Sequence, residues 1–214
     1  MATPAKAYDA VLFDLLTALL DSWTVWNTSA GSAEDGLRWR RKYLELTYDA
    51  GAYRPYEEIV RQAAIQSGVG TGAADALVAN WETISPWPEA ARVMQTLSQH
   101  LPLGVATNCS IPLGRTAAAL VGVPFKAVVT AEEAGFYKPR PEPYRMALAQ
   151  LGTRPERTLF VAGSAADVPG ARGVGMPVYW HNRMGLAPVG TAKPDFTHAS
   201  LEPLLGIVLP GFGS

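Results

Sequence analysis

Short, uniformly apolar runs recur along the chain and alternate with stretches of helical character. The first run, Val11 to Phe13, lacks the alternation of a half-exposed strand. Such a run predicts a strand that is buried on both faces, as in the centre of a parallel sheet. Further strands are expected at Leu103 to Thr107, Ala127 to Thr130, Thr158 to Ala162 and Pro177 to Trp180, with a candidate edge strand at Phe196 to Ala199.

The segments between the later strands have the character of helices. Helices are expected at Glu89 to His100, Pro112 to Val121, Glu142 to Leu151 and Asp167 to Val174. Strands that alternate with helices imply right-handed crossovers between parallel strands. The predicted fold class is therefore α/β, with a doubly wound parallel sheet and a Rossmann-like core.

A long helical excursion separates the first strand from the second. Helices are predicted at Ser32 to Gly51, Tyr56 to Ser67 and Gly72 to Ile84. The preceding SWTVWNTSAG, residues 22 to 31, is interpreted as the segment through which the chain leaves the sheet, and no helix is assigned to it. Pro86-Trp87-Pro88 marks the return of the chain. We expect an α/β core from 1 to 20 and 88 to 214, and an inserted helical cap from 21 to 87.

Composition narrows the range of partners. The chain of 214 residues has a net charge of −1, so there is no electrostatic case for nucleic acid or an anionic membrane as a partner. It has one cysteine, no run of eighteen apolar residues and no apolar signal segment in Met1 to Ala7. We expect a cytoplasmic protein without nucleic-acid or membrane partners.

Polar residues stand where the predicted strands end. They are Asp14 after the first strand, Thr107 and Asn108 at the second, Lys138 beyond the third, and Ser164 and Asp167 after the fourth. Taken singly, each has a structural explanation, such as a helix cap, a turn or a solvated lysine. The carboxyl ends of parallel strands meet at one crevice, where open α/β sheets bind their ligands. Their coincidence therefore favours an active site.

Asp14 is the candidate nucleophile of that site. A desolvated and aimed carboxylate can form a covalent ester, which divides one difficult displacement into two steps. Lys138 would keep Asp14 ionised, because a nearby cation favours the charged form. Thr107 and Asn108 would donate hydrogen bonds, and Asp167 would orient or deprotonate the water that opens the ester.

Two consecutive arginines lie in the first predicted cap helix. Arg40 and Arg41 flank an apolar stripe formed by Leu37 and Leu44, so at least one guanidinium is expected to be covered. A covered arginine needs an anion, because an unpaired buried charge is costly. One alternative is a salt bridge to Glu45 or to a neighbouring helix. The other is a bidentate clamp for a substrate carboxylate, which Arg suits better than Lys.

The polar motifs resemble those of the haloacid dehalogenase superfamily. The four segments are FDLLTALLD, VATNCS, YKPRPEPY and FVAGSAADVPGARGVGM, in the order and spacing of that superfamily. Most of its members are magnesium-dependent phosphatases, which carry acidic residues where this chain has Leu16 and Gly163. Magnesium needs several oxygen ligands, so the resemblance implies a site without a metal or another cofactor.

Within the superfamily, the chain resembles the 2-haloacid dehalogenase branch. WRRKYLEL is similar to a cap segment of that branch whose arginine, here Arg40, receives the departing halide. Tyr144 matches a tyrosine of its site, and YWHNR at Tyr179 to Arg183 is similar to another of its segments.

The resemblance also implies a substrate and a mechanism. Asp14 would displace halide from a short 2-haloalkanoic acid, and water aligned by Asp167 and Lys138 would hydrolyse the aspartyl ester to a 2-hydroxy acid. Backbone, Thr107 and Asn108 donors would hold the substrate carboxylate. The expected substrate-binding residues are Leu16, Arg41, Leu44, Tyr144 and Ser164.

Some positions depart from the branch. Thr17 and Ala18 stand where Gly and Thr are usual, which removes a hydroxyl four residues after Asp14, and the sequence does not decide whether Thr17 replaces it. Ala162, Gly163 and Ser164 stand where the branch usually has Ser, Ser and Asn. These departures leave two alternatives to a 2-haloacid dehalogenase. One is a magnesium-dependent small-molecule phosphatase with altered motifs, and the other is a catalytically silent binding member of the superfamily.

The tryptophans of the cap bear on assembly. Trp23, Trp26 and Trp81 predict an apolar cap surface, and this favours a homodimer.

Overall fold

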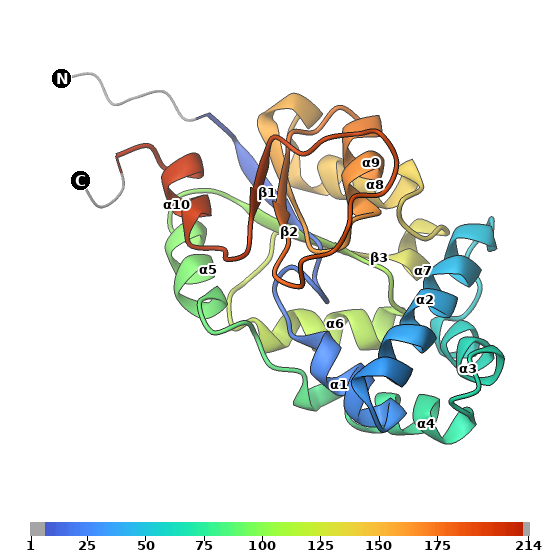
Figure 1. Ribbon diagram of the computed structural model, residues 1–214. Coiled ribbons are helices and arrows are strands. Elements are labelled where there is room, and N and C mark those ends of the chain that lie inside the picture. Colours follow the sequence, from blue (N-terminus) through green and yellow to red (C-terminus); the bar gives the residue numbers. More distant parts are fainter. Residues whose placement is uncertain (1–6, 212–214) are drawn as a thin grey trace.

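The structure, a computed structural model, describes residues 7 to 211 of the chain. Within this range the centre is a six-stranded parallel sheet in the order β3-β2-β1-β4-β5-β6 (Figure 1). Its strands are β1 (Ala10–Phe13), β2 (Leu103–Thr107), β3 (Ala127–Thr130), β4 (Thr158–Ala162), β5 (Val178–His181) and β6 (Phe196–His198). Helices cover both faces, so the predicted α/β class with a doubly wound parallel sheet is confirmed.

Each face of the sheet is buried under a helical layer. One face carries α8 (Pro141–Leu151) and α9 (Asp167–Gly173), and the other carries α5 (Ala90–Ser98), α6 (Ile111–Leu120) and α10 (Pro203–Val208). In β1, Ala10 and Leu12 belong to the first apolar layer, whereas Val11 and Phe13 belong to the second. All four side chains are fully buried. This strand is therefore apolar throughout because it faces a helical layer on both sides.

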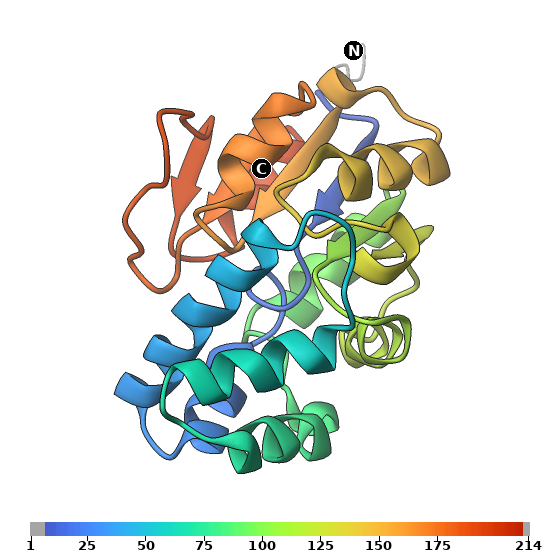
Figure 2. The ribbon, with the colours of Figure 1, turned by 90° about the vertical axis from the view of Figure 1, so that its right-hand side faces the viewer.

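A second group of helices lies beyond the carboxyl ends of the strands (Figures 1 and 2). It comprises α1 (Ser22–Ala30), α2 (Ala33–Asp49), α3 (Tyr56–Gln66), α4 (Thr71–Ala79) and the 3-10 helix η1 (Trp81–Thr83). Aromatic side chains fill its interior. Trp39 is fully buried there, and its indole Nε1 donates to the carbonyl of Val60 at 2.9 Å.

The predicted strands agree closely with the observed ones, and no strand boundary differs by more than one residue. The helix predicted at Gly72 to Ile84 is divided, because α4 ends at Ala79 and η1 follows it. Some helical elements of the described chain have no predicted counterpart. They are α1, α10, the four-residue α7 (Ala131–Ala134) and the 3-10 helix η2 (Pro155–Arg157).

Of these, α1 matters most for the site. The side chain of Asp21 caps it by accepting a hydrogen bond from Thr24 N at 3.1 Å, and Gly31 ends it with a left-handed φ of 89°. An Asp before a helix and a Gly after it are ordinary start and stop signals. Trp23 and Trp26 are three residues apart and so share one helical face. The segment from 22 to 31 is thus a helix rather than only an exit from the sheet, and its two caps are visible in the sequence.

The two crossings of the chain between the sheet and the second helical group run side by side. Leu20 and Pro86 form an antiparallel bridge, and Asp21 N donates to the carbonyl of Ser85 at 2.8 Å. The division into a core (1–20 and 88–214) and a cap (21–87) stays a prediction, and it places both boundaries at this pair of crossings.

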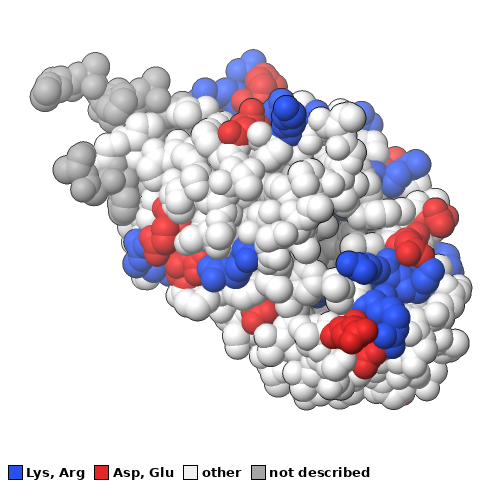
Figure 3. Space-filling view, in the orientation of Figure 1, with Lys and Arg blue, Asp and Glu red and all other residues white. Residues whose placement is uncertain are grey.

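The cap tryptophans do not form the exposed apolar surface that the sequence suggested. Trp26 and Trp81 are only 2% and 1% exposed because they pack inside the helical group, and Trp23 packs against Arg40. The predicted homodimer loses this support and stays a prediction. On the face shown in Figure 3, basic and acidic side chains lie close together in small groups.

Membrane insertion through a helix has no support in the described range. None of the helices between residues 7 and 211 combines the length and the apolar character that crossing a membrane requires. Residues 1 to 6 of the segment considered for a signal sequence lie outside the described residues.

Candidate active site

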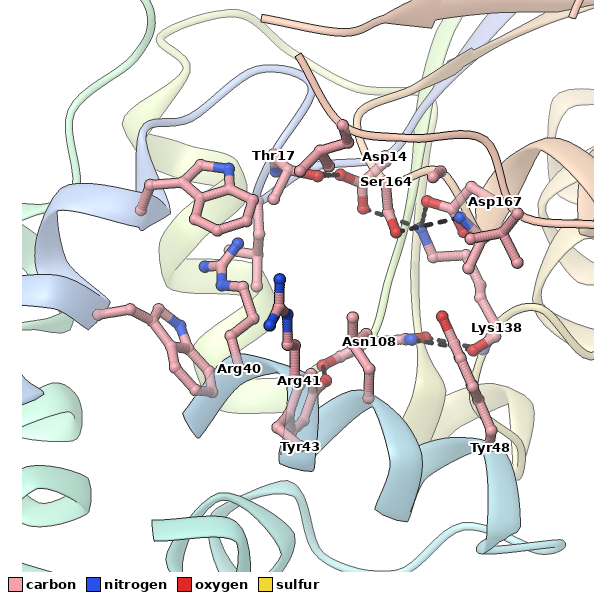
Figure 4. A pocket seen from close by; sticks show the side chains of 18 of the residues that line it. Asp14, Thr17, Arg40, Arg41, Tyr43, Tyr48, Asn108, Lys138, Ser164 and Asp167 are labelled. Carbon is pink, nitrogen blue, oxygen red and sulfur yellow. Dashed lines mark hydrogen bonds and ion pairs between the residues drawn. The ribbon is translucent and has the colours of Figure 1, made fainter. Parts of the chain in front are cut away.

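A cavity of about 330 Å³ opens at the carboxyl ends of the strands and is closed on one side by α2. The structure brings most of the predicted site residues together in its wall (Figure 4). Those that line it are Asp14, Leu16, Arg40, Arg41, Leu44, Asn108, Lys138, Ser164 and Asp167. Two predicted residues, Thr107 and Tyr144, are not part of this wall.

A buried ion cluster lies at the sheet side of the cavity. Lys138 Nζ is 2.8 Å from Asp14 Oδ1 and 3.0 Å from Asp167 Oδ2. The three side chains are 2%, 9% and 6% exposed, respectively. Charges are tolerated at such depth only when they are paired and hydrogen-bonded. Lys138 therefore holds the two carboxylates in place and offsets part of their charge.

The second oxygen of Asp14 is held by the loop that follows it. Asp14 Oδ2 accepts hydrogen bonds from Thr17 N at 3.0 Å, from Thr17 Oγ1 at 2.6 Å and from Ala18 N at 3.2 Å. The hydroxyl of Thr17 thus reaches the carboxylate although Ala18 has none. A Cβ on Gly163 would lie 2.3 Å from Ala18 N and 2.4 Å from Thr17 Oγ1. Only glycine leaves room for this loop.

The two carboxylates of the cluster differ in their affinity for protons. Burial alone would raise the pKa of Asp14, but the charge of Lys138 and the hydrogen bonds from Lys138 and Thr17 outweigh it, so the pKa lies below the ordinary 3.8. Burial raises the pKa of Asp167 above 3.8, and the nearby Asp14 adds to this rise, although Lys138 and Tyr144 oppose it. Asp14 is therefore the more firmly ionised of the two, and Asp167 is the better proton acceptor.

Lys138 keeps its charge at this depth. Burial lowers its pKa, but the charges of Asp14 and Asp167 outweigh that effect and leave the pKa above 10.5. Its backbone is fixed by Asn108, because Lys138 N donates to Asn108 Oδ1 at 2.8 Å and Asn108 Nδ2 donates to the Lys138 carbonyl at 3.1 Å. The side-chain amide of Asn108 is thus largely engaged in positioning Lys138.

Thr107 and Tyr144 lie behind the wall of the cavity. Thr107 is fully buried, and its Oγ1 is 3.4 Å from the sulfur of Cys109. Tyr144 is also fully buried, and its hydroxyl donates to Asp167 Oδ1 at 2.9 Å. Thr107 therefore lies behind the wall and Tyr144 supports Asp167, and the roles expected for both toward a substrate stay predictions.

Arg40 is held between two indole rings. Its guanidinium carbon lies 4.0 Å from the ring centroid of Trp23 and 5.0 Å from that of Trp26. Its Nη2 donates to Ser22 Oγ at 2.8 Å. Burial lowers the pKa of Arg40 to about 10, so the side chain is still a cation at neutral pH. Both indoles lie close enough to the guanidinium to attract its charge.

The salt-bridge alternative does not hold for either arginine within residues 7 to 211. Glu45 pairs with Lys42 instead, and neither Arg40 nor Arg41 forms an ion pair with a described residue. Arg41 is exposed, and its guanidinium points into the cavity beside that of Arg40 (Figure 4). The charged residues of the cavity wall are three cations and two carboxylates, so the wall has one cation in excess. Such a wall favours an anionic ligand.

Sequence reasoning missed part of the wall. From the helical group come Trp23, Trp26, Tyr43, Tyr48 and Tyr56, and from the loop between β5 and β6 come Leu186, Ala187 and Val189. The helix signals of 22 to 31 could have revealed the two tryptophans. The loop residues carry no chemical signal in the sequence.

Magnesium, which the phosphatases of the superfamily use, does not fit these residues. The ammonium of Lys138 stands between the only two carboxylates of the described wall, and Gly163 replaces a further ligand at a position without space for a side chain. No group of three or more His, Cys, Asp or Glu in the described range could hold a metal ion. Magnesium needs near-octahedral oxygen coordination, which this donor set does not supply.

Known proteins that resemble the chain include both dehalogenases and phosphatases. Haloacetate dehalogenase H-2 of Moraxella sp. (strain B) is 27% identical over an alignment of 222 positions, gaps included, which covers 95% of this chain and 99% of that protein. Phosphoglycolate phosphatase of Rhodospirillum rubrum is 33% identical over a shorter stretch, which covers 59% of this chain and 56% of that protein. Among solved structures, the L-2-haloacid dehalogenase RSc1362 has a TM-score of 0.84 at 25% identity and covers 94% of this chain and 99% of its own.

The family model of the haloacid dehalogenase-like hydrolases matches residues 8–175. This range extends from β1 through the helical group to α9 and so includes Asp14, Lys138 and Asp167. The chain belongs to the haloacid dehalogenase-like hydrolase family.

Proposed function

We propose that this hydrolase is a 2-haloacid dehalogenase, which acts on the carbon–halide bond of a short 2-haloalkanoic acid without a metal. The observation that carries the proposal is the buried Asp14, oriented by Thr17, Ala18 and Lys138, which shares a cavity with Arg40, a cation without a carboxylate partner among the described residues. The coverage of haloacetate dehalogenase H-2 over nearly its full length supports the same reading.

In the first step, Asp14 attacks the carbon that bears the halogen. Among the described residues, three donors bind Oδ2 and one binds Oδ1, so Oδ1 retains more lone-pair density for the attack. A C–O bond forms, the C–X bond breaks, and the halide leaves with its electron pair towards the guanidinium edge of Arg40. The fixed orientation of the carboxylate reduces the entropic cost of this displacement.

In the second step, water hydrolyses the aspartyl ester. Asp167 takes a proton from the water, whose oxygen attacks the carboxyl carbon of Asp14. The bond between that carbon and the ester oxygen then breaks, and the 2-hydroxy acid leaves with the proton from Asp167. The second proton of the water is released to solvent when Asp14 ionises again. Tyr144 keeps Asp167 aligned throughout through its hydroxyl.

The two arginines match the two anions of this reaction. Arg40 lies between the indoles as the acceptor for the halide, and Arg41 projects into the cavity as a partner for the substrate carboxylate. Thr107 lies outside the wall and Asn108 is engaged with Lys138, so Arg41 is a better candidate than either for binding the substrate carboxylate. With one carboxylate bound, the charges of the wall are balanced.

Halide release tests the proposed activity directly. We expect the protein to release chloride from one enantiomer of 2-chloropropionate in EDTA, with no gain on addition of magnesium, because the site has no ligand set for that ion. Asp14→Asn is expected to lose this activity, whereas Asp49→Asn, at the exposed end of α2, is expected to retain it. Chloride release should be measured by ion chromatography.

Two other results would contradict the proposal. Turnover of a phosphate ester that depends on magnesium, without chloride release, would favour a phosphatase, in line with the relative from Rhodospirillum rubrum. No turnover of either substrate class would favour a silent binding member.

Arg41 provides a second prediction. Arg41→Gln should raise KM for 2-chloropropionate about tenfold and change kcat by less than about twofold, because the charge-assisted contact is made equally in the ground state and the transition state. Arg40→Gln should instead lower kcat, because the halide charge develops only in the transition state. Arg38→Gln is the matched control, since Arg38 lies on the same helix but pairs with Asp35. Equal KM values for Arg41→Gln and Arg38→Gln would refute the assignment.

The two steps should separate as the pH falls. Asp14 has a pKa below 3.8 and stays ionised in mild acid, whereas Asp167, with a pKa raised above 3.8, gains a proton first. In the ester, Asp14 is neutral and no longer raises the pKa of Asp167, but burial, the largest cause of the rise, remains. Ester hydrolysis should therefore slow at a higher pH than ester formation, so that the ester accumulates. A rapid-quench experiment should show a chloride burst that grows relative to the steady-state rate as the pH is lowered. If both rates decline in parallel, the division of roles between the two carboxylates is wrong.

A further inference from the structure

One peptide group in the loop after the nucleophile is held at both ends. The peptide between Thr17 and Ala18 directs its N–H to Asp14 Oδ2 at 3.2 Å and its carbonyl to the indole Nε1–H of Trp87 at 3.1 Å. Because a peptide group is planar, fixing the carbonyl also fixes the direction of the N–H. The indole of Trp87 therefore orients the Ala18 N–H that donates to Asp14, although Trp87 does not line the cavity.

The next carbonyl of the loop is held in the same way by a histidine. His181, at the end of β5, is 1% exposed, and its Nδ1 lies 2.8 Å from the carbonyl oxygen of Ala18. A carbonyl can only accept, so Nδ1 carries the proton. Burial lowers the pKa of His181, which keeps the ring neutral at neutral pH. The rings of Trp87 and His181 meet edge to face, with centroids 6.4 Å apart.

Trp87 belongs to the returning crossing between the helical group and the sheet. Its backbone N donates to the carbonyl of Leu19 at 3.0 Å, so the residue holds the nucleophile loop through both its backbone and its side chain. The guanidinium of Arg183 covers the indole, with its carbon 4.7 Å from the ring centroid, and Arg183 also forms an ion pair with Glu89. The indole is thus packed in one orientation.

From this geometry we infer that Trp87 and His181 are positioning residues, which orient the Thr17–Ala18 segment so that its amides hold Asp14 for attack. The inference rests on the proposed function and deepens it. Hydrogen bonds in series polarise one another, so an indole on the carbonyl strengthens the amide as a donor to the carboxylate. This support acts on the loop whose two amides bind Asp14 Oδ2 together with the Thr17 hydroxyl.

The test compares two tryptophans that make the same kind of bond. Trp87→Phe keeps an aromatic ring and removes the N–H that binds the Thr17 carbonyl. Trp81→Phe removes an equivalent bond, from Nε1 to the carbonyl of Leu113 at 2.8 Å, at a buried position outside the cavity wall. We expect Trp87→Phe to slow ester formation about tenfold, with KM changed less than about twofold, and Trp81→Phe to leave both unchanged.

The pH profile separates positioning from a general loss of stability. A weaker amide bond to Asp14 Oδ2 favours the protonated carboxyl, so the acid limb of ester formation should move to higher pH in Trp87→Phe and stay in place in Trp81→Phe. His181→Leu should have the same effect as Trp87→Phe. His181→Asn should restore much of the rate, because its amide nitrogen can occupy the place of Nδ1.

A measurement that does not depend on catalysis tests this inference separately from the proposed function. Amide hydrogen exchange by NMR gives the ratio of the exchange rate at Ala18 to that at Leu12, a buried residue of β1 that serves as an internal reference. This ratio should rise in Trp87→Phe and stay unchanged in Trp81→Phe. If the wild type releases no halide, the proposed function fails while this ratio still tests the positioning. Equal ratios and equal acid limbs in the two variants would overturn the inference.

Discussion

The site depends on one buried ammonium group shared by two carboxylates. Lys138 is 2% exposed and lies within 3.0 Å of both Asp14 and Asp167. Removing Lys138 would leave two uncompensated carboxylates in the interior, and breaking a buried pair in this way costs about 3–5 kcal/mol. The same arrangement lowers the pKa of one carboxyl and leaves that of the other raised. A single lysine thus supports both a firmly ionised nucleophile and a proton acceptor beside it.

The fold explains how residues that are distant in the sequence form this cluster. Asp14, Asn108 and Asp167 follow three neighbouring strands, and Lys138 lies in the segment after the edge strand β3. The uniformly apolar strands gave a sheet that is buried on both faces, and the polar residues at their ends had to meet at one edge. The order of the strands along the chain and their apolar character therefore sufficed to predict the sheet and the cluster at its edge, because the parallel topology brings the strand ends together.

Other parts of the site were beyond such reasoning, for physical reasons. A sequence pattern places a side chain on a strand end but does not give its direction, so Thr107 was expected in the cavity although it points to Cys109. The sequence likewise does not show that the hydroxyl of Tyr144 binds Asp167 from behind the cavity wall. The two indoles around Arg40 and the indole of Trp87 depend on how distant elements pack, and this is not visible in spacing alone. The close approach that requires Gly163 has the same origin.

Oxygen tracing in a single turnover tests the central claim most directly. With enzyme in excess over 2-chloropropionate in ¹⁸O-water, the account predicts that the first 2-hydroxy acid carries unlabelled oxygen from Asp14 and that the peptide containing Asp14 gains one ¹⁸O. Labelled hydroxyl in the first product, with an unlabelled Asp14, would show that water attacks the substrate directly. That result would contradict the role of Asp14 as nucleophile.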